Sequence, residues 1–128
     1  MPGHLIRLRG AWERRDPAVP DAVPARVVLP LDRPLADAPF RLERRFGLPR
    51  PGPGESVRLR LEEVPGLVAV ALNGQPLAQP APGTTALTLE PGPALQRRNV
   101  LALDVDPSRW ASPPETWGRV ALEIGPEP

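Results

Sequence analysis

Apolar and charged residues alternate along several short segments of the chain, and this period of two is the pattern of β-strands that bury one face. The clearest segment is 56–64, SVRLRLEEV, in which Val57, Leu59 and Leu61 point one way and charged side chains point the other. The same pattern predicts inward-facing residues in segments 99–106 (Leu101, Leu103 and Val105) and 118–124 (Val120, Leu122 and Ile124). Further strands are predicted at residues 5–12, 25–31, 40–46 and 85–90.

Two segments depart from simple alternation. In residues 5–12, Ile6 and Leu8 share one face, and Gly10 permits a bulge before Trp12. Residues 67–72, LVAVAL, are apolar on both faces. A strand of this kind is expected to be central in its sheet and covered on both sides.

The dipeptide Asn73-Gly74 directly follows that apolar run, in the sequence VAVALNGQPL. Asn and Gly tolerate the positive φ angles that both central residues of a type I′ turn require, so the pair predicts a two-residue hairpin. The alternative is a ligand-binding role for Asn73, because loop tips often carry function.

Prolines separate the predicted strands. The chain has 21 prolines, which lie mostly between the apolar segments and leave little room for a helix of ordinary length. One short helical turn is expected in residues 91–98, PGPALQRR. About eight strands joined by Pro- and Gly-rich loops predict an all-β sandwich or barrel, and we expect one domain over residues 1–128.

The charge balance and composition exclude several classes of protein. The 16 basic residues are all arginine, and they are interleaved with 15 acidic residues instead of forming the basic face of a nucleic-acid-binding protein. The chain has no cysteine, which excludes disulfides and thiolate chemistry. It has no apolar run of membrane-span or signal-peptide length, so a cytoplasmic location without membrane contact is the default expectation.

Residues that would support catalysis are few. His4 is the only histidine and lies near the N-terminus, so a nucleophile–His–acid triad or a His-based metal site would depend on it alone. Glu62 and Glu63 are adjacent on a predicted strand and therefore point to opposite faces. We expect no catalytic residues and no enzyme activity from this chain.

Two features of the predicted strands suggest other sites. Asp104 and Asp106 are two residues apart at a strand end and are candidates for a structural calcium site. Two carboxylates alone supply few of the six or more oxygen ligands that calcium takes. The favoured alternative is turn capping and pairing with a nearby arginine, with no cofactor. Arg44 lies in phase with apolar residues of segment 40–46, so we expect an ion pair with Asp104 or Glu62, or a ligand contact.

The loop DPSRWASPPETWG, residues 106–118, holds two of the three tryptophans. The ring of Trp110 offers a face on which a sugar can stack, and Arg109 and Glu115 are groups that bind hydroxyls. The alternative is that the tryptophans anchor the loop through their hydrogen-bonded N–H groups. For Trp117, next to the last strand, we expect a place in the core.

Several of these segments, taken in order, resemble a known family. FRLERRFGLP, VRLRLEEVPGLVAVALNGQPL, TTALTLEPGPALQRRNVLALDVD and WGRVALEI are similar to the sugar-binding, galactose-binding-like jelly roll at the N-terminus of glycoside hydrolase family 2 β-galactosidases and β-glucuronidases. The resemblance covers roughly residues 5–125 and implies a jelly-roll β-sandwich of about eight mainly antiparallel strands. In that family the catalytic carboxylates lie in a separate barrel domain, which this sequence lacks.

The sequence therefore predicts a non-catalytic binding module with carbohydrate as its first expected ligand. Trp110, Arg109, Arg44 and Glu115 are the candidate ligand-binding residues. The alternative is a structural or protein-interaction module with no affinity for sugar, since a fold does not fix a function. The sequence does not indicate the oligomeric state.

Overall fold

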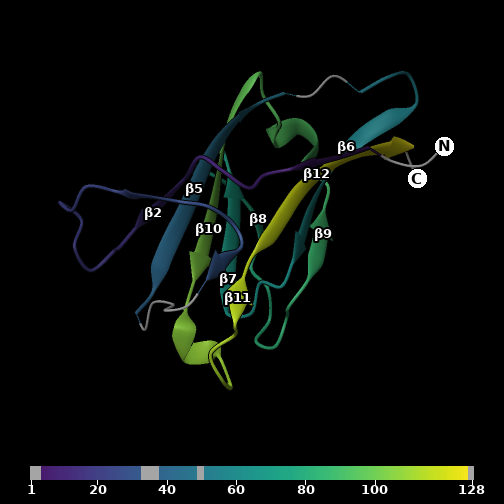
Figure 1. The fold of residues 1–128 in the computed structure, drawn as a ribbon. Helices are drawn as coiled ribbons and strands as arrows, with labels where there is room; N and C mark the ends of the chain where they lie inside the picture. The colour runs from purple at the N-terminus through teal and green to yellow at the C-terminus, as the bar shows by residue number, and fades with distance from the viewer. Residues whose placement is uncertain (1–3, 33–37, 49–50, 127–128) are drawn as a thin grey trace.

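The computed structural model describes residues 4–32, 38–48 and 51–126 and shows two antiparallel sheets packed face to face (Figure 1). The four-stranded sheet has the order β1-β12-β6-β9, formed by His4–Arg7, Arg119–Pro126, Glu55–Glu62 and Leu87–Leu89. The six-stranded sheet has the order β3-β2-β5-β10-β7-β8, formed by Ala25–Val27, Trp12–Arg15, Phe40–Gly47, Arg98–Val105, Leu67–Leu72 and Gln75–Ala78. The short strands β4 (Leu31–Asp32) and β11 (Thr116–Trp117) pair separately.

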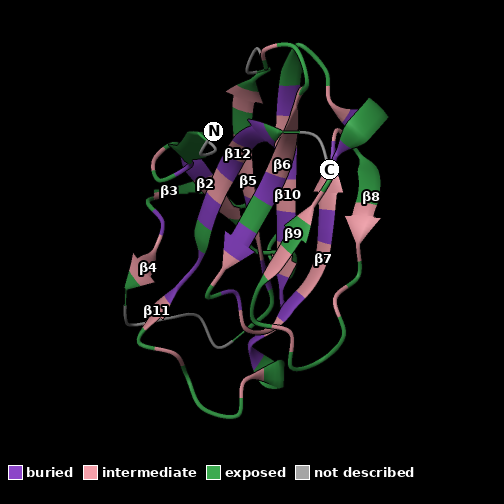
Figure 2. Ribbon diagram, turned by 90° about the vertical axis from the view of Figure 1, so that its right-hand side faces the viewer, coloured by how far each residue is buried: buried purple, intermediate pink, exposed green. Residues whose placement is uncertain are grey.

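Apolar side chains from both sheets meet in one buried cluster, and buried positions alternate with more exposed ones along the central strands (Figure 2). Leu59 and Leu61 of β6 are buried as the alternation predicts, while Val57 is half-buried near the strand start. The predicted inward residues of β10 and β12 are all buried: Leu101, Leu103, Val105, Val120, Leu122 and Ile124. The predicted all-β sandwich is therefore confirmed, and its topology is consistent with a jelly roll.

The helical content of the described residues is limited to two 3₁₀ turns. The turn η1 (Gly92–Ala94) lies inside the predicted segment 91–98, and η2 (Pro107–Arg109) follows β10. No helix in the described part of the chain is long and apolar enough to cross a membrane.

The hairpin between β7 and β8 has the predicted tight turn. Leu72 pairs with Gln75, and Asn73 and Gly74 have φ angles of 54° and 79°. Positive φ at both positions is the requirement of a type I′ turn, so the prediction from the Asn-Gly pair is confirmed.

Asn73 has a second role that its turn preference does not reveal. Its side chain accepts a hydrogen bond from the Val100 amide (2.8 Å) and donates to the Asn99 side chain (3.0 Å). Asn99 is 1% exposed. Its side-chain amide accepts a hydrogen bond from the Gln96 backbone N–H and donates one to the Gln96 carbonyl oxygen. These bonds fasten the hairpin tip to the start of β10 and satisfy a buried polar side chain.

Three strand predictions were wrong. Residues 25–31 do not form one strand: β3 ends at Val27 in the six-stranded sheet, and Leu31 belongs to β4, which pairs with β11 instead. Residues 5–12 form two strands in different sheets, because the chain leaves the four-stranded sheet after Leu8, passes Ala11 at φ 61° and enters the other sheet at Trp12. Leu8 is buried, but Ile6 is 37% exposed near the edge of its sheet. The strand β7 is not central: it lies between β10 and the edge strand β8, and Ala69 and Ala71 on its outer face are only half-buried.

Candidate functional site

The loop that follows β10 is fastened to the turn after β6 by two tryptophans. The indole N–H groups of Trp110 and Trp117 both donate to the carbonyl oxygen of Pro65, at 2.8 and 2.7 Å. Trp117 is fully buried and contacts the ring of Phe40 edge-on at 6.2 Å between centroids. The expected core position of Trp117 is therefore confirmed, and Trp110 is half-buried against the same cluster.

Gly66 makes this anchoring possible. Its φ is +76°, and a Cβ atom at this position would lie 2.6 Å from the Trp110 Nε1 atom and 2.7 Å from the Asp106 carbonyl oxygen. The Asp106 amide also donates to the Gly66 carbonyl at 2.9 Å. Only glycine fits both the backbone conformation and the close approach of the loop.

The other predicted sugar-binding residues of this loop lie on its surface. Arg109 is exposed and donates to the Pro80 carbonyl at 3.4 Å, and Glu115 is exposed. The indole N–H of Trp110 already has a backbone acceptor, so only its half-exposed ring remains for stacking. Sugar binding by Trp110, Arg109 and Glu115 stays a prediction.

Arg44 does not form the ion pair that its position led us to expect. Its Nε atom donates to the Gly10 carbonyl at 2.7 Å, and an Nη atom donates to the Arg45 carbonyl at 3.1 Å. Burial lowers the pKa of Arg44. Among the described residues no carboxylate pairs with it, because the predicted partners Asp104 and Glu62 are bonded to Arg41 and Arg60.

The carboxylates of Asp104 and Asp106 have separate structural partners. Asp104 accepts two hydrogen bonds from Arg41, at 2.7 and 3.0 Å. Asp106 caps η2 by accepting from the Ser108 amide at 3.0 Å, and these bonds lower the pKa of Asp106. Pairing and turn capping, the alternative to a calcium site, are what the structure shows, and the described residues contain no cluster of three or more metal-binding side chains.

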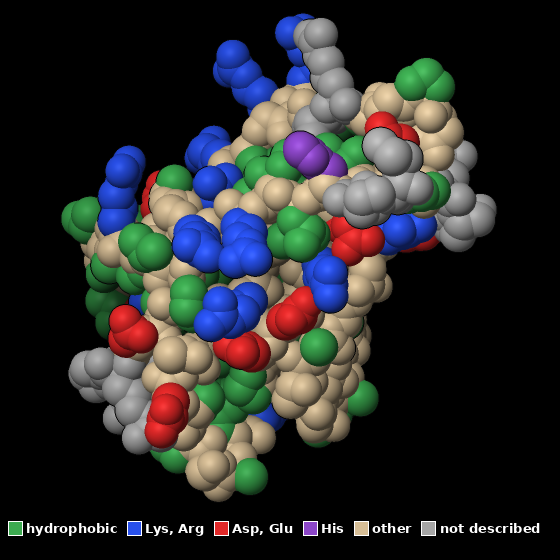
Figure 3. Space-filling model, turned by 45° about the vertical axis from the view of Figure 1, so that its right-hand side comes forward, with side chains coloured by type: hydrophobic (Ala, Val, Ile, Leu, Met, Phe, Trp, Pro, Cys, Tyr) green, Lys and Arg blue, Asp and Glu red, His purple; other side chains and the backbone are tan. Residues whose placement is uncertain are grey.

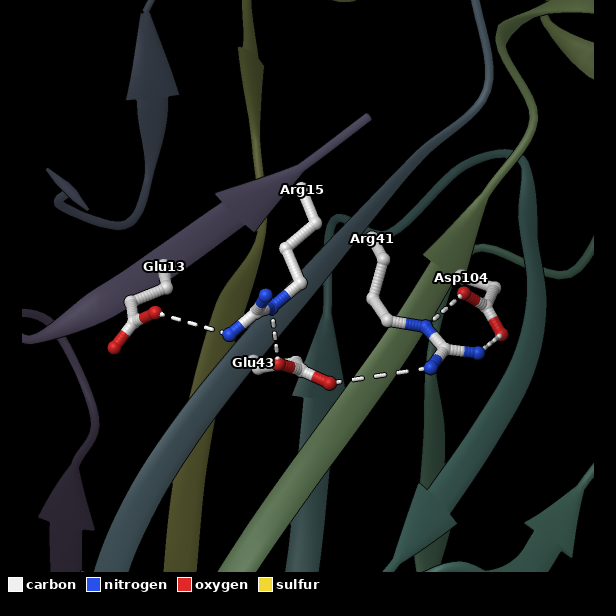
Figure 4. Close-up of polar contacts among 5 residues, drawn as sticks. All are labelled: Glu13, Arg15, Arg41, Glu43 and Asp104. Carbon is white, nitrogen blue, oxygen red and sulfur yellow. Dashed lines mark hydrogen bonds and ion pairs between the residues drawn. The ribbon is translucent and has the colours of Figure 1, made fainter. Parts of the chain in front are cut away.

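The Arg41–Asp104 pair belongs to a chain of ion pairs across the outer face of the six-stranded sheet (Figure 4). Arg15 of β2 contacts Glu43 of β5 at 2.6 Å and Glu13 at 3.4 Å. Glu43 also lies 3.9 Å from Arg41. The bonds to Asp104 raise the pKa of Arg41.

The strand register explains why Arg15 pairs diagonally with Glu43. Glu13 lies directly opposite Glu43, and Arg15 lies directly opposite Arg41, so like charges face each other across β2 and β5. Like charges in such positions are destabilising unless they find other partners. The diagonal contact of Arg15 with Glu43 supplies one such partner, and Arg41 finds Asp104 directly across from it on β10.

A hollow of about 370 Å³ lies beside this network. Its polar lining consists of Arg15, Asp16, Arg41 and Asp104. Its other wall is the loop between β2 and β3, which contributes Pro17, Val19, Pro20 and Ala22. That loop is held by hydrogen bonds from Val19 and Ala22 to backbone carbonyls and from Ala18 to the Asp16 carboxylate.

The hollow offers donors and acceptors side by side. In the bidentate pair, Arg41 uses two of its five N–H groups and Asp104 uses about two of its four lone-pair positions. The remaining groups of both side chains suit a hydroxyl, which donates to a carboxylate and accepts from a guanidinium. Two arginines and two aspartates line the hollow, so its formal charge is balanced.

The four-stranded sheet carries a second set of charges on its outer face, where arginine side chains gather among acidic ones (Figure 3). Arg60 pairs with Glu62 at 2.7 Å and with Glu123 at 3.3 Å. Glu63, which has φ 53°, pairs with Arg119 at 3.0 Å. The adjacent residues Glu62 and Glu63 therefore have separate arginine partners.

Sequence reasoning predicted an arginine partner for Asp104 but did not identify it as Arg41, and it missed the hollow beside the pair. Arg44 was the arginine proposed to pair with Asp104 or Glu62. The signal that joins Arg41 to its partner is the register of β5 and β10, in which Arg41 lies opposite Asp104. That register follows from the tertiary fold and is not visible in either segment alone.

No family model matches the sequence, and no curated protein is similar to it at a significant level. Solved structures do match. The FMN-binding β-glucuronidase of Facaelibacterium prausnitzii L2-6 has a TM-score of 0.78 and 18% identity over 97% of this chain and 23% of its own. The β-glucuronidase of Bacteroides uniformis has a TM-score of 0.73 and 20% identity over 97% of this chain and 18% of its own.

A putative β-galactosidase from Bacteroides fragilis also matches, with a TM-score of 0.71, 17% identity and coverage of 97% of this chain and 23% of that chain. The resemblance to the galactose-binding-like jelly roll of glycoside hydrolase family 2 is thereby confirmed at the level of the fold. The chain spans only about a fifth of the length of these three enzymes, and its described residues contain no catalytic barrel.

Proposed function

We propose that this chain is a non-catalytic carbohydrate-binding module and that a neutral sugar binds in the hollow beside the Arg41–Asp104 pair. The single observation that supports the proposal is the balanced, bidentate pair at the side of a hollow of about 370 Å³. This volume falls within the roughly 300–1,000 Å³ range of small-molecule sites.

The polar and the apolar lining residues would make different contacts with a sugar. Arg15, Arg41 and Asp104 supply donors and acceptors for neighbouring hydroxyl groups. Pro17, Val19 and Pro20 supply an apolar wall against which the C–H face of a sugar ring can pack. Because the ion-pair network fixes the polar side chains before a ligand arrives, little conformational entropy is lost on binding.

The test is a glycan-array screen followed by calorimetric titration of the neutral sugars that bind. Arg41→Met should weaken binding by roughly tenfold or more, since it leaves Asp104 without its partner and removes hydroxyl donors. Arg58→Met is the matched control, because Arg58 also has two carboxylate partners, at 3.6 and 3.7 Å, but lies on the other sheet. Equal binding by wild type and Arg41→Met would refute the proposed site.

The second candidate function is a structural or protein-interaction module. It is supported by the comparison, because the same fold is a small part of each matching enzyme, 23% in the FMN-binding β-glucuronidase. An array without any bound glycan, together with capture of a protein partner, would favour this function over carbohydrate binding.

A further inference from the structure

The edge of the four-stranded sheet at β1 is open along part of its length. β1 pairs only with β12, with Leu5 opposite Glu123 and Arg7 opposite Ala121. Just beyond the strand, the Leu8 amide donates to the Val120 carbonyl at 2.9 Å. Since bonded and non-bonded residues alternate in an antiparallel pair, the backbone groups of Leu5 and Arg7 point away from β12.

Arg9 provides an independent check of this geometry. Its carbonyl oxygen accepts a hydrogen bond from the Leu29 amide at 2.7 Å, on the side away from β12. The segment at Leu29 thus covers the edge only beside Arg9. Among the described residues no strand pairs with the outer edge of β1 at Leu5 or Arg7.

A hollow of about 150 Å³ adjoins this open edge. Leu5, Leu29 and Pro30 contribute apolar lining. Its charged lining consists of four arginines and one glutamate: Arg7, Arg9, Arg60, Arg119 and Glu62. The space is suited to a single side chain, not to a large ligand.

The charge of this hollow is not balanced. Arg60 and Arg119 have carboxylate partners, at 2.7 and 3.0 Å. Arg7 and Arg9 are exposed, and no carboxylate of the described residues pairs with either one. The edge therefore presents two guanidinium groups, which bind carboxylates well.

We propose that an acidic polypeptide segment binds here in extended conformation, as an added strand beside β1. Its backbone would bond to the free groups of Leu5 and Arg7, as in other cases of strand addition. An acidic side chain would enter the hollow toward Arg7 and Arg9, and an apolar one would cover Leu5, which is 45% exposed. Two copies of β1 would bring like charges together, so an acidic partner fits better than a second copy.

The test uses the full chain and a fluorescein-labelled peptide of about eight residues that alternates glutamate and valine. Binding is measured by fluorescence anisotropy. The double variant R7E/R9E should bind roughly tenfold or more weakly, whereas R97E/R98E, with the same change of charge at exposed positions where β10 of the other sheet begins, should bind like wild type. Equal losses in both variants, or no binding by wild type, would overturn the proposal.

Two further measurements separate strand addition from simple charge attraction. A peptide with the same side chains but N-methylated backbone should lose roughly tenfold in affinity, because it cannot form ladder bonds. In wild-type protein, the unlabelled peptide should slow hydrogen exchange of the Leu5 and Arg7 amides and leave the Leu8 amide unchanged. Undiminished binding of the N-methylated peptide, or unchanged exchange at Leu5 and Arg7, would overturn the proposal.

Discussion

The hollow beside the Arg41–Asp104 pair and the hollow beside β1 differ in how their charges are matched. Beside the six-stranded sheet, Arg41 and Asp104 form a bidentate pair, and two arginines and two aspartates line the space. Beside β1, four arginines line the space with one glutamate, and Arg7 and Arg9 lack carboxylate partners among the described residues. A balanced set of donors and acceptors suits a neutral polyhydroxy ligand, whereas unmatched guanidinium groups suit a carboxylate.

The difference also shows how similar residues acquire separate roles on one scaffold. Both hollows lie on outer faces of sheets, and arginine side chains line both. In the first, the register of β5 and β10 brings an acid opposite Arg41. In the second, Arg7 lies opposite Ala121 of β12, which offers no acidic group to its guanidinium. Strand register therefore helps decide whether an arginine is neutralised within the fold, as at Arg41, or remains open to a partner, as at Arg7.

The largest effect is expected from Gly66→Ala, in the turn that anchors the loop after β10 and that belongs to neither hollow. The added Cβ would lie within 2.7 Å of both Trp110 and Asp106, so the loop after β10 must move. We expect the free energy of unfolding to fall by about 3 kcal/mol or more. Thermal and urea unfolding measure the loss, and unchanged stability would contradict the anchoring role of this turn.

Asp104→Asn should change which ligand the first hollow prefers. The substitution leaves the lining with a net positive charge, so affinity for glucuronate should rise relative to galactose by about fivefold or more. Stability should fall by about 1 kcal/mol or less, because the pair is partly exposed and screened by solvent. Calorimetric titration with both sugars provides the ratio, and a ratio equal to that of wild type would argue against ligand contact with this pair.

Salt concentration should affect ligand binding at the two hollows differently. Raising the salt concentration from about 50 mM to about 500 mM should weaken binding of the acidic peptide at β1 several-fold, because exposed charges are screened. Binding of a neutral sugar should change by less than about twofold, since no net charge is neutralised. Parallel titrations at both salt concentrations measure the effect, and equal salt dependence would remove the distinction drawn between the two surfaces.

The smallest effect concerns pH and Asp106, which follows the strand that carries Asp104. Its pKa is lowered in the folded state by the hydrogen bonds from Ser108. A lowered pKa contributes stability above the unfolded-state pKa of about 4, and this stability is lost as the pH falls through the folded-state pKa. Asp106→Asn retains an acceptor but does not titrate, so its melting temperature should fall slightly less than that of wild type on acidification. An identical fall in both proteins would contradict the assignment.

Local features were predictable from the sequence. The φ angles of Asn73 and Gly74 follow from the preferences of those two residues, and the buried positions of β6, β10 and β12 follow from alternation. The break at Leu8 was missed because alternation continues in the sequence while the backbone changes sheets.

Partners between distant segments were not predictable. Arg44 was in phase with apolar residues, but its acceptors are backbone carbonyls of Gly10 and Arg45, which no sequence pattern marks. The shared acceptor of the two tryptophans is also a backbone carbonyl, that of Pro65. Such contacts depend on how loops fold over the sheets, and their geometry is set only when the strands have paired.

The central claim is that a neutral sugar binds beside the Arg41–Asp104 pair, and amide chemical-shift mapping tests it most directly. Titration of ¹⁵N-labelled protein with a sugar identified on the array should shift the amides of Arg15, Asp16, Arg41 and Asp104. The chemical shifts of amides in the Trp110 loop and in β1 should not change. Shifts confined to Arg109, Trp110 and Glu115, or no shifts at any of these positions, would contradict the account.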